Sequence, residues 1–104
     1  MFELYQSEKD GKFYFRLKAK NGQVILMSEG YESKISAQTG ISSVKNSVAE
    51  QNQFEIRKAK NGKSYFVLKA KNGKIVGKSQ FFWSESSLTP AINEVIEHAK
   101  AAAY

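Results

Sequence analysis

The length and composition of the chain allow one small globular domain and exclude several classes of protein. It has 104 residues, of which 41% are hydrophobic and 12% aromatic, enough for one modest core. It contains no cysteine, which excludes disulfides and thiolate metal sites and suits a reducing, cytoplasmic location. No secretory signal pattern opens the chain, and no apolar run is long enough to span a membrane, so no membrane contact is expected. The net charge of +6 favours a polyanionic partner.

The first part of the chain predicts three short strands. Residues 2–5 alternate in polarity, and Asp10-Gly11 marks a turn. A second strand follows over residues 13–19. Its core-facing residues alternate along the strand and are Phe13, Phe15, Leu17 and Ala19. Asn21-Gly22 predicts a two-residue type I′ hairpin turn, with positive φ at both residues, before a third strand over residues 23–27.

A helix is predicted after the third strand, because the apolar period changes from two to about 3.6. Its apolar stripe consists of Ala37, Ile41, Val44 and Val48. Ser33 and Ser36 are suitable N-cap residues. Gly40 costs about 1 kcal/mol of helix propensity relative to alanine, and a close approach of helix and sheet would explain it.

The same pattern then occurs a second time. Residues 11–33 match residues 62–84 at an offset of 51, with twelve identities in twenty-three positions. The segments at residues 2–4 and 54–56 also match, but at an offset of 52, so the second copy lacks one residue in the turn before Gly62. Internal similarity of this kind indicates a repeated structural unit.

The second helix repeats the stripe of the first. Its apolar residues are Leu88, Ile92, Val95 and Ala99. Ser84 and Ser87 are suitable N-cap residues, and Pro90 is acceptable in the first helical turn, where backbone N–H groups lack helical partners.

These elements predict an α+β fold of two tandem βββα repeats, residues 1–50 and 53–104, within a single domain over residues 1–104. We expect a pseudo-twofold antiparallel sheet with both helices on the face that carries the apolar strand residues. One unit of about fifty residues is near the lower limit for a stable core. Two copies in one chain therefore favour a monomer with the internal symmetry of a dimer.

Several short motifs resemble those of one known family. They are Gly11-Lys12 with Tyr14-Phe15, Leu17-Lys18-Ala19 with Asn21-Gly22, Ser28 and Tyr31 with Ser33, and Gly40-Ile41 with Ser43-Val44. On these residues the chain resembles the YegP-like family of small, mostly bacterial proteins. The resemblance implies βββα repeats joined in a single sheet with exchanged terminal strands, so that the segment Phe54-Glu55-Ile56-Arg57 would link the copies. It implies no established reaction, cofactor or substrate.

The chemically reactive residues do not form a recognisable catalytic pattern. His98 is the only histidine and Asp10 the only aspartate, and no nucleophile motif accompanies them. Glu94 and Glu97 fit the solvated face of a helix. The glycines occur singly along the chain, which excludes a glycine-rich phosphate loop. We therefore expect no enzyme, no cofactor and no metal site.

Positive charge is concentrated in the strand segments. Residues 1–31 and 54–80 hold thirteen lysines and arginines against five acidic residues, whereas the rest of the chain is slightly acidic. The residues expected on the strand face opposite the core include tyrosines among the basic side chains, and the candidate nucleic-acid face is Tyr14, Arg16, Lys18, Tyr65 and Lys69. Such a face can stack unpaired bases and contact phosphates. The simpler interpretation, which we favour, is an ordinary solvated face of an antiparallel sheet.

One aromatic cluster distinguishes the second copy from the first. Phe81 and Trp83 replace Gly30 and Glu32, and Phe82 matches Tyr31 as a core residue. We expect at least one of the two new rings to be buried, because exposing so much apolar surface is costly. If exposed, they would form a partner patch. The sequence thus predicts a non-enzymatic binding or interaction module with an unknown partner, with weak binding of single-stranded nucleic acid as the alternative.

Overall fold

The computed structural model describes residues 1–49 and 53–101 of the chain. They form strands and helices in a repeated order: β1 (Phe2–Gln6), β2 (Phe13–Lys18), β3 (Val24–Met27), α1 (Lys34–Ser47), β4 (Phe54–Lys58), β5 (Ser64–Lys69), β6 (Ile75–Lys78), the short 3₁₀ turn η2 (Glu85–Ser87) and α2 (Leu88–Ala101). The predicted α+β fold of two tandem βββα units is confirmed.

All the strands lie in one antiparallel sheet, in the order β1-β2-β3-β6-β5-β4. The two repeats join at the centre, where β3 pairs with β6 through Met27 and Lys78. The Gln80 side chain also donates a hydrogen bond of 2.6 Å to the Val24 carbonyl across this junction.

The expected strand exchange is wrong. The segment Phe54-Glu55-Ile56-Arg57 lies in β4, at one edge of the sheet, and pairs with β5 of its own repeat. Strand β1 likewise pairs with β2. Each first strand is separated from its partner by a short turn, so local pairing costs less loop-closure entropy than exchange with the other repeat. The central strands, rather than the outer ones, therefore link the copies.

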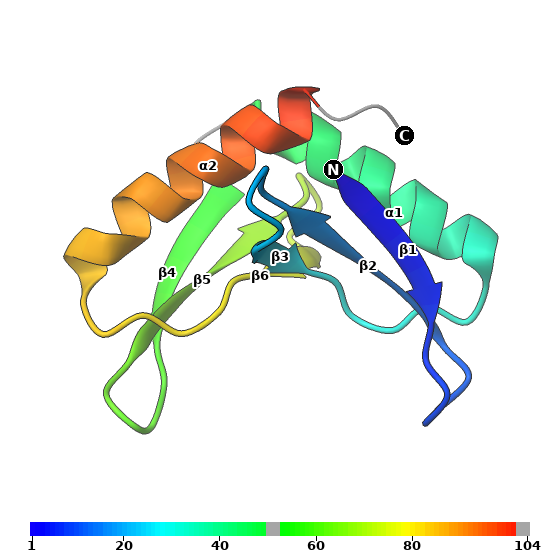
Figure 1. Ribbon diagram of the computed structural model, residues 1–104, viewed down its shortest axis with the longest axis horizontal. Coiled ribbons are helices and arrows are strands. Elements are labelled where there is room, and N and C mark those ends of the chain that lie inside the picture. Colours follow the sequence, from blue (N-terminus) through cyan, green and yellow to red (C-terminus); the bar gives the residue numbers. More distant parts are fainter. Residues whose placement is uncertain (50–52, 102–104) are drawn as a thin grey trace.

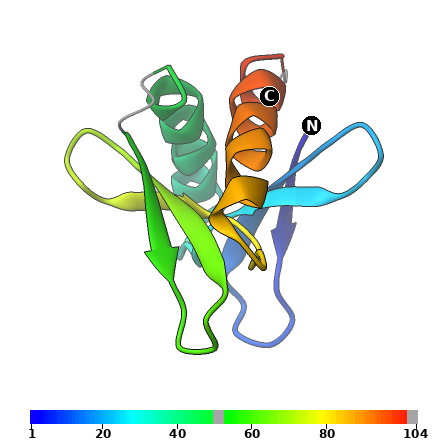
Figure 2. The same cartoon turned by 90° about the vertical axis from the view of Figure 1, so that its left-hand side faces the viewer.

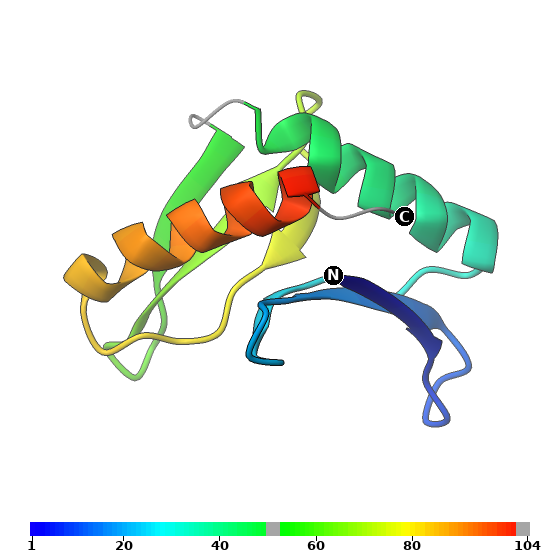
Figure 3. The same ribbon diagram turned by 45° about the horizontal axis from the view of Figure 1, so that its top comes forward.

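Both helices cover one face of the sheet. Figure 1 shows the sheet as an arch, with α1 and α2 above it and the open face below. The helices lie next to each other in the turned views (Figures 2 and 3). Helix α1 contacts β2 of its own repeat and β6 of the other, and α2 contacts β5 of its own repeat as well as β2 and β3. Each helix therefore contacts both repeats, whereas the outer strands β1 and β4 pair only within their own repeat.

One apolar cluster between the helices and the sheet forms the core. Its buried residues include Phe15, Leu17, Ile41, Val44, Phe66, Leu68 and Val95, and Ile92 packs against them while partly buried. The cluster confirms the strand alternation at Phe15 and Leu17 and the helix stripes, whereas Phe13 is only partly buried and lies outside the cluster.

Gly40 lies where α1 approaches the sheet most tightly. A Cβ atom at this position would lie 2.5 Å from the Tyr31 hydroxyl oxygen and 2.9 Å from Cε2 of Phe15. Such distances are closer than van der Waals contact allows. The close approach expected from the sequence is confirmed, and it explains a glycine inside a helix.

At the start of the same helix, the Ser33 hydroxyl accepts the N–H of Ser36 at 3.1 Å, which confirms the expected N-cap.

The hairpin turns differ from the predicted type I′ geometry. Gly22 and Gly73 have φ of +85° and +84°, but no non-glycine residue among the described ones has a positive φ. The Gly22 N–H bonds to the Ala19 carbonyl, and the Ala19 N–H bonds to the Gln23 carbonyl, so three residues connect the strands. An ordinary turn followed by one left-handed glycine suits this length, and only the glycine then needs positive φ.

The junction between the repeats is asymmetric. Leu26 and Gly77 occupy equivalent positions on β3 and β6, and both face the core through their pairing with Leu17 and Leu68. A Cβ atom at Gly77 would lie 2.6 Å from Cδ2 of Leu26. The leucine of one repeat therefore fills the space that a side chain of the other would need.

Candidate functional site

The open face of the sheet carries one continuous row of side chains. Directly opposed residues of neighbouring antiparallel strands point to the same face. The row crosses the sheet in the order Glu3, Arg16, Met27, Lys78, Val67 and Glu55. Both of its ends are acidic, so the expected basic face contains a carboxylate at each edge.

Glu3 neutralises two of the basic residues on this face. Its Oε1 atom accepts a hydrogen bond of 2.6 Å from Nε of Arg16, and its Oε2 atom lies 3.3 Å from Nζ of Lys18. The hydrogen bonds from Arg16 and Lys18 hold the pKa of Glu3 below its ordinary value. The carboxylate is thus held in its charged form against both cations.

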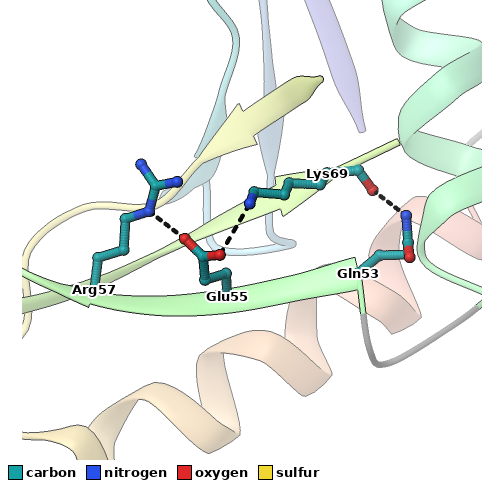
Figure 4. Close-up of polar contacts among 4 residues, drawn as sticks. All are labelled: Gln53, Glu55, Arg57 and Lys69. Atoms are coloured by element: carbon teal, nitrogen blue, oxygen red, sulfur yellow. Dashed lines mark hydrogen bonds and ion pairs between the residues drawn. The ribbon is translucent and has the colours of Figure 1, made fainter. Parts of the chain in front are cut away.

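Glu55 has the same role in the second repeat (Figure 4). Nζ of Lys69 donates to its Oε1 atom at 2.9 Å, and Arg57 pairs with Oε2. These two hydrogen bonds lower the pKa of Glu55, that from Lys69 having the larger effect. Gln53 extends the group by donating to the Lys69 carbonyl at 2.8 Å.

The two tyrosines of the expected nucleic-acid face have different surroundings. Tyr14 stacks on Tyr5 with ring centroids 5.8 Å apart, and its hydroxyl donates to Asp10 at 2.6 Å, which raises the pKa of Tyr14. Tyr65 instead meets Phe81 edge to face, with centroids 5.5 Å apart and ring planes at 76°. Tyr14 is thus held by Tyr5 and Asp10, whereas Tyr65 forms an open aromatic corner with Phe81.

Phe81 and Trp83 are both exposed, so the expectation that at least one ring is buried is wrong. The two residues are 50% and 84% exposed, respectively. The core position at this corner belongs to Phe82, which stacks on Phe66 with centroids 6.4 Å apart. Neighbours of an inward-pointing residue in an extended segment point outward. The exposed Trp83 ring is contacted by Nζ of Lys63, 4.3 Å from its centroid.

A depression of about 790 Å³ opens on this face where the repeats join, mostly over the second repeat. Apolar side chains of three strands line it, namely Met27, Val67 and Ile75, and the aromatic corner of Tyr65 and Phe81 forms a further part of its lining. This volume lies within the range of about 300–1,000 Å³ that is usual for small-molecule sites.

Three charged side chains also line the depression. Lys78 lies with Nζ 5.0 Å from the ring centroid of Tyr65 and 5.8 Å from that of Phe81. Arg57 reaches it from β4, and Glu29 from the segment after β3. Two cations thus share this surface with one carboxylate.

The first repeat is built differently at the equivalent positions. Arg16, bonded to Glu3, takes the place of Val67. Gly30 takes the place of Phe81, and a Cβ atom there would lie 2.8 Å from Cδ of Lys12 and 3.0 Å from the Tyr14 hydroxyl oxygen. Polar side chains therefore cover the surface of the first repeat that corresponds to the depression.

Comparison with known proteins places the chain in one family. A family model described as "Domain of unknown function (DUF1508)" matches it twice, over residues 8–55 and 59–104. The chain belongs to the DUF1508 family. Two curated relatives of this DUF1508 chain are UPF0339 proteins. That of Pasteurella multocida is 50% identical over 91 residues, which cover 88% of this chain and 80% of that protein. The UPF0339 protein YegP of Escherichia coli is 46% identical over 94 residues, which cover 90% and 84%.

Solved structures agree with the DUF1508 assignment. The solution NMR structure of E. coli YegP has a TM-score of 0.89 and 43% identity, and the match covers 96% of this chain and 85% of that one. A UPF0339 protein of Shewanella oneidensis also has a TM-score of 0.89, with 40% identity and 97% and 85% coverage. The resemblance to the YegP-like family is confirmed. YegP is described in that structure as a protein of unknown function, so the likeness shows the fold and brings no activity.

Sequence reasoning on this DUF1508 chain missed several residues of the depression. Met27 was assigned only to the third strand, and Val67, Ile75 and Lys78 were not singled out as site residues. A signal was present in the repeat itself, because Lys78 replaces Met27 and Val67 replaces Arg16 between the copies. Departures from internal symmetry on the open face of the sheet mark places where one copy has a different surface.

Two further observations concern the described part of the DUF1508 chain. No group of three histidine, aspartate or glutamate side chains in residues 1–49 and 53–101 is arranged to hold a metal ion. Within the same ranges, neither helix has the length and apolar character needed to cross a bilayer.

Proposed function

We propose that the chain is a non-enzymatic binding module whose ligand occupies the depression on the open face of the second repeat. The observation that carries this proposal is the half-exposed Phe81 ring beside a cavity of about 790 Å³. Exposed aromatic surface next to an apolar cavity with a few polar groups is typical of ligand sites. The lining residues lie on or directly beside paired strands, which hold them in place without a ligand.

The positions of the reactive residues support a role without catalysis. Nδ1 of His98 lies 2.9 Å from the Glu94 carbonyl oxygen on α2. Asp10 accepts hydrogen bonds from the Tyr14 hydroxyl and the Lys12 N–H in the β1–β2 turn. Each of these groups is engaged in its own element, and neither lines the depression. We further propose a cytoplasmic location, which the lack of cysteine supports, and a monomer, which the internal repeat supports.

Binding of single-stranded nucleic acid is the alternative. Arg16, Lys18 and Lys69 would contact phosphates, but each already pairs with Glu3 or Glu55. A phosphate would have to compete with these carboxylates, which weakens the electrostatic term that dominates such binding. Binding of single-stranded nucleic acid therefore stays a prediction, and titration with an oligonucleotide tests it.

The test is an NMR experiment with the ¹⁵N-labelled full chain. It is titrated with the small-molecule fraction of a bacterial cytoplasmic extract, and separately with the oligonucleotide dT10. We expect the extract to shift the backbone amides of Val67, Lys78 and Ser79, which border the depression. Shifts with dT10 that centre on Tyr14, Arg16 and Lys18 would instead favour the nucleic-acid alternative.

A matched control uses the internal repeat. In Phe81→Gly, the second repeat receives the residue of the first at this position, Gly30. Phe81 is half-exposed and outside the apolar core, so the variant is expected to fold. Loss of the extract-induced shifts in Phe81→Gly supports the proposal. Shifts that are equal in both proteins, or no shifts with the parent chain, contradict it.

A further inference from the structure

We infer that the ligand of the depression is a planar anion, an aromatic ring that carries a carboxylate or a phosphate group. This inference rests on the proposed binding function and names the chemical class of ligand that the site takes. Two features of the depression carry it, an aromatic corner and a lysine that forms no ion pair within the described residues.

The corner fits a flat ring. The ring planes of Tyr65 and Phe81 stand at 76° with their centroids 5.5 Å apart. A planar group can stack on one ring while its edge meets the other, and both arrangements are favourable for aromatic pairs. Ile75 adds apolar contact from β6, and Val67 also lines the depression but is only 2% exposed. An aliphatic ligand would gain buried area here but would not use the angle between the rings.

The charge comes from Lys78. It faces the two rings, and within residues 1–49 and 53–101 no carboxylate forms an ion pair with it. In the sheet, Lys78 pairs with Met27 and Val67, which cannot neutralise it. Two other lysines on this face, Lys18 and Lys69, are each bonded to a glutamate. An anionic group of the ligand would give Lys78 the partner that its neighbours already have.

Two other charged side chains, Arg57 and Glu29, affect the electrostatic potential in the depression. Arg57 is paired with Glu55 but also lines the depression, so it adds positive potential without being free. Glu29 lines it as well and opposes an anion. Charge complementarity therefore rests on Lys78, and removal of Glu29 should strengthen binding.

Two lysine variants form a matched pair for the test. Lys78→Met and Lys74→Gln each replace a lysine by its counterpart in the first repeat, Met27 and Gln23. Both lower the net charge by one, but only Lys78 lines the depression. Both side chains are exposed, so both variants are expected to fold. Glu29→Gln is the third variant.

Affinities are measured by NMR titration of the full chain with four probes. Phenylacetate is compared with 2-phenylethanol, and AMP with adenosine, so that each pair differs in its anionic group. The two pairs distinguish a carboxylate ligand from a phosphate ligand.

We expect at least one anion to bind about tenfold more tightly than its neutral partner, since a charge-assisted hydrogen bond of about 1.5 kcal/mol corresponds to that factor. Lys78→Met should abolish this preference, Lys74→Gln should change it less than about twofold, and Glu29→Gln should raise it about threefold. Equal binding of both members of each pair at the depression would overturn the anion class and leave the binding site standing. No shift at Val67 or Lys78 with any probe, although the extract shifts them, would overturn the planar anion alone. Equal weakening by both lysine variants would also overturn it, since net charge would then explain the effect.

Discussion

The connections between the strands of each hairpin depend on single glycines. Ala-Lys-Asn-Gly occurs before Gln23, Lys63 and Lys74, and in each turn the asparagine Oδ1 accepts the N–H of that following residue at 2.9–3.0 Å. Gly22, Gly62 and Gly73 all have φ between +82° and +85°, with nothing within 4 Å of an added Cβ. Space is therefore available at these positions, and only the backbone conformation restricts the residue.

We predict that Gly22→Val and Gly73→Val each lower the free energy of unfolding by about 1–3 kcal/mol, because a β-branched residue resists positive φ. Chemical denaturation measures this. Asn21→Ala is the control, since Asn21 has a negative φ and loses only one exposed hydrogen bond, at a cost of about 1 kcal/mol or less. A valine variant as stable as the parent chain would contradict the turn geometry.

Glu3 and Glu55 make stability depend on pH. The basic partners hold the pKa of both carboxyls below their ordinary value of 4.5, so the folded state favours the ionised form. Their contribution is complete above about pH 4.5 and is lost as the pH falls through the lower folded-state pKa. We predict that the double variant Glu3→Gln, Glu55→Gln loses less thermal stability than the parent chain between about pH 6 and about pH 3. Thermal melts across this range measure it, and parallel curves for the two proteins would refute the prediction.

These residue-scale features were only partly accessible from the sequence. The glycine turns were recognised, but their type was not, because Asn-Gly fits two turn lengths and the strand register decides between them. Glu3 and Glu55 could not be matched to Arg16 and Lys69 without that register. The basic face was therefore expected to be freer of carboxylates than it is.

At the scale of elements, the contact between α1 and the sheet is set by two linked positions. Gly40 meets Tyr31 in the first repeat, and their counterparts in the second are Ala91 and Phe82, which lacks the hydroxyl. The first repeat thus combines the smaller helix residue, glycine, with the larger ring, tyrosine. The second combines alanine with the smaller ring of phenylalanine.

We predict that Gly40→Ala destabilises the protein by about 1–3 kcal/mol through overpacking, although alanine is the better helix former by about 1 kcal/mol. Adding Tyr31→Phe should recover part of the loss, because it removes the atom that lies 2.5 Å from the new Cβ. A double-mutant cycle from denaturation curves measures the coupling. Additive effects of the two changes would show that the hydroxyl does not restrict this position.

The elements themselves were largely predictable, and their pairing partly so. The repeated motifs located the strands and helices, since alternation and the helical stripe depend on local sequence. Which strands would join the repeats did not follow, because β1 and β4 could pair locally or with the other copy. The depression was also missed, since it arises where non-adjacent segments such as β4 and β6 border one surface.

At the scale of the whole molecule, the two repeats meet at one pair of residues of unequal size, Leu26 and Gly77. We predict that Gly77→Leu destabilises the protein by about 1–3 kcal/mol or more, because its Cβ would lie 2.6 Å from Cδ2 of Leu26. The exchange Leu26→Gly with Gly77→Leu should restore a large part of this loss, since the pseudo-twofold axis makes the two sides nearly equivalent. Denaturation of the three proteins measures it. An exchanged protein no more stable than Gly77→Leu alone would show that the sides are not interchangeable.

The same pair bears on the ancestry of the chain. In a homodimer of single repeats, the position beside the axis would carry the same residue twice, so that two leucines would collide or two glycines would leave a hole. A duplicated and fused gene escapes this constraint, because each half can mutate alone. With leucine in one half and glycine in the other, a homodimer of either half would lack the complementary pair that this junction has.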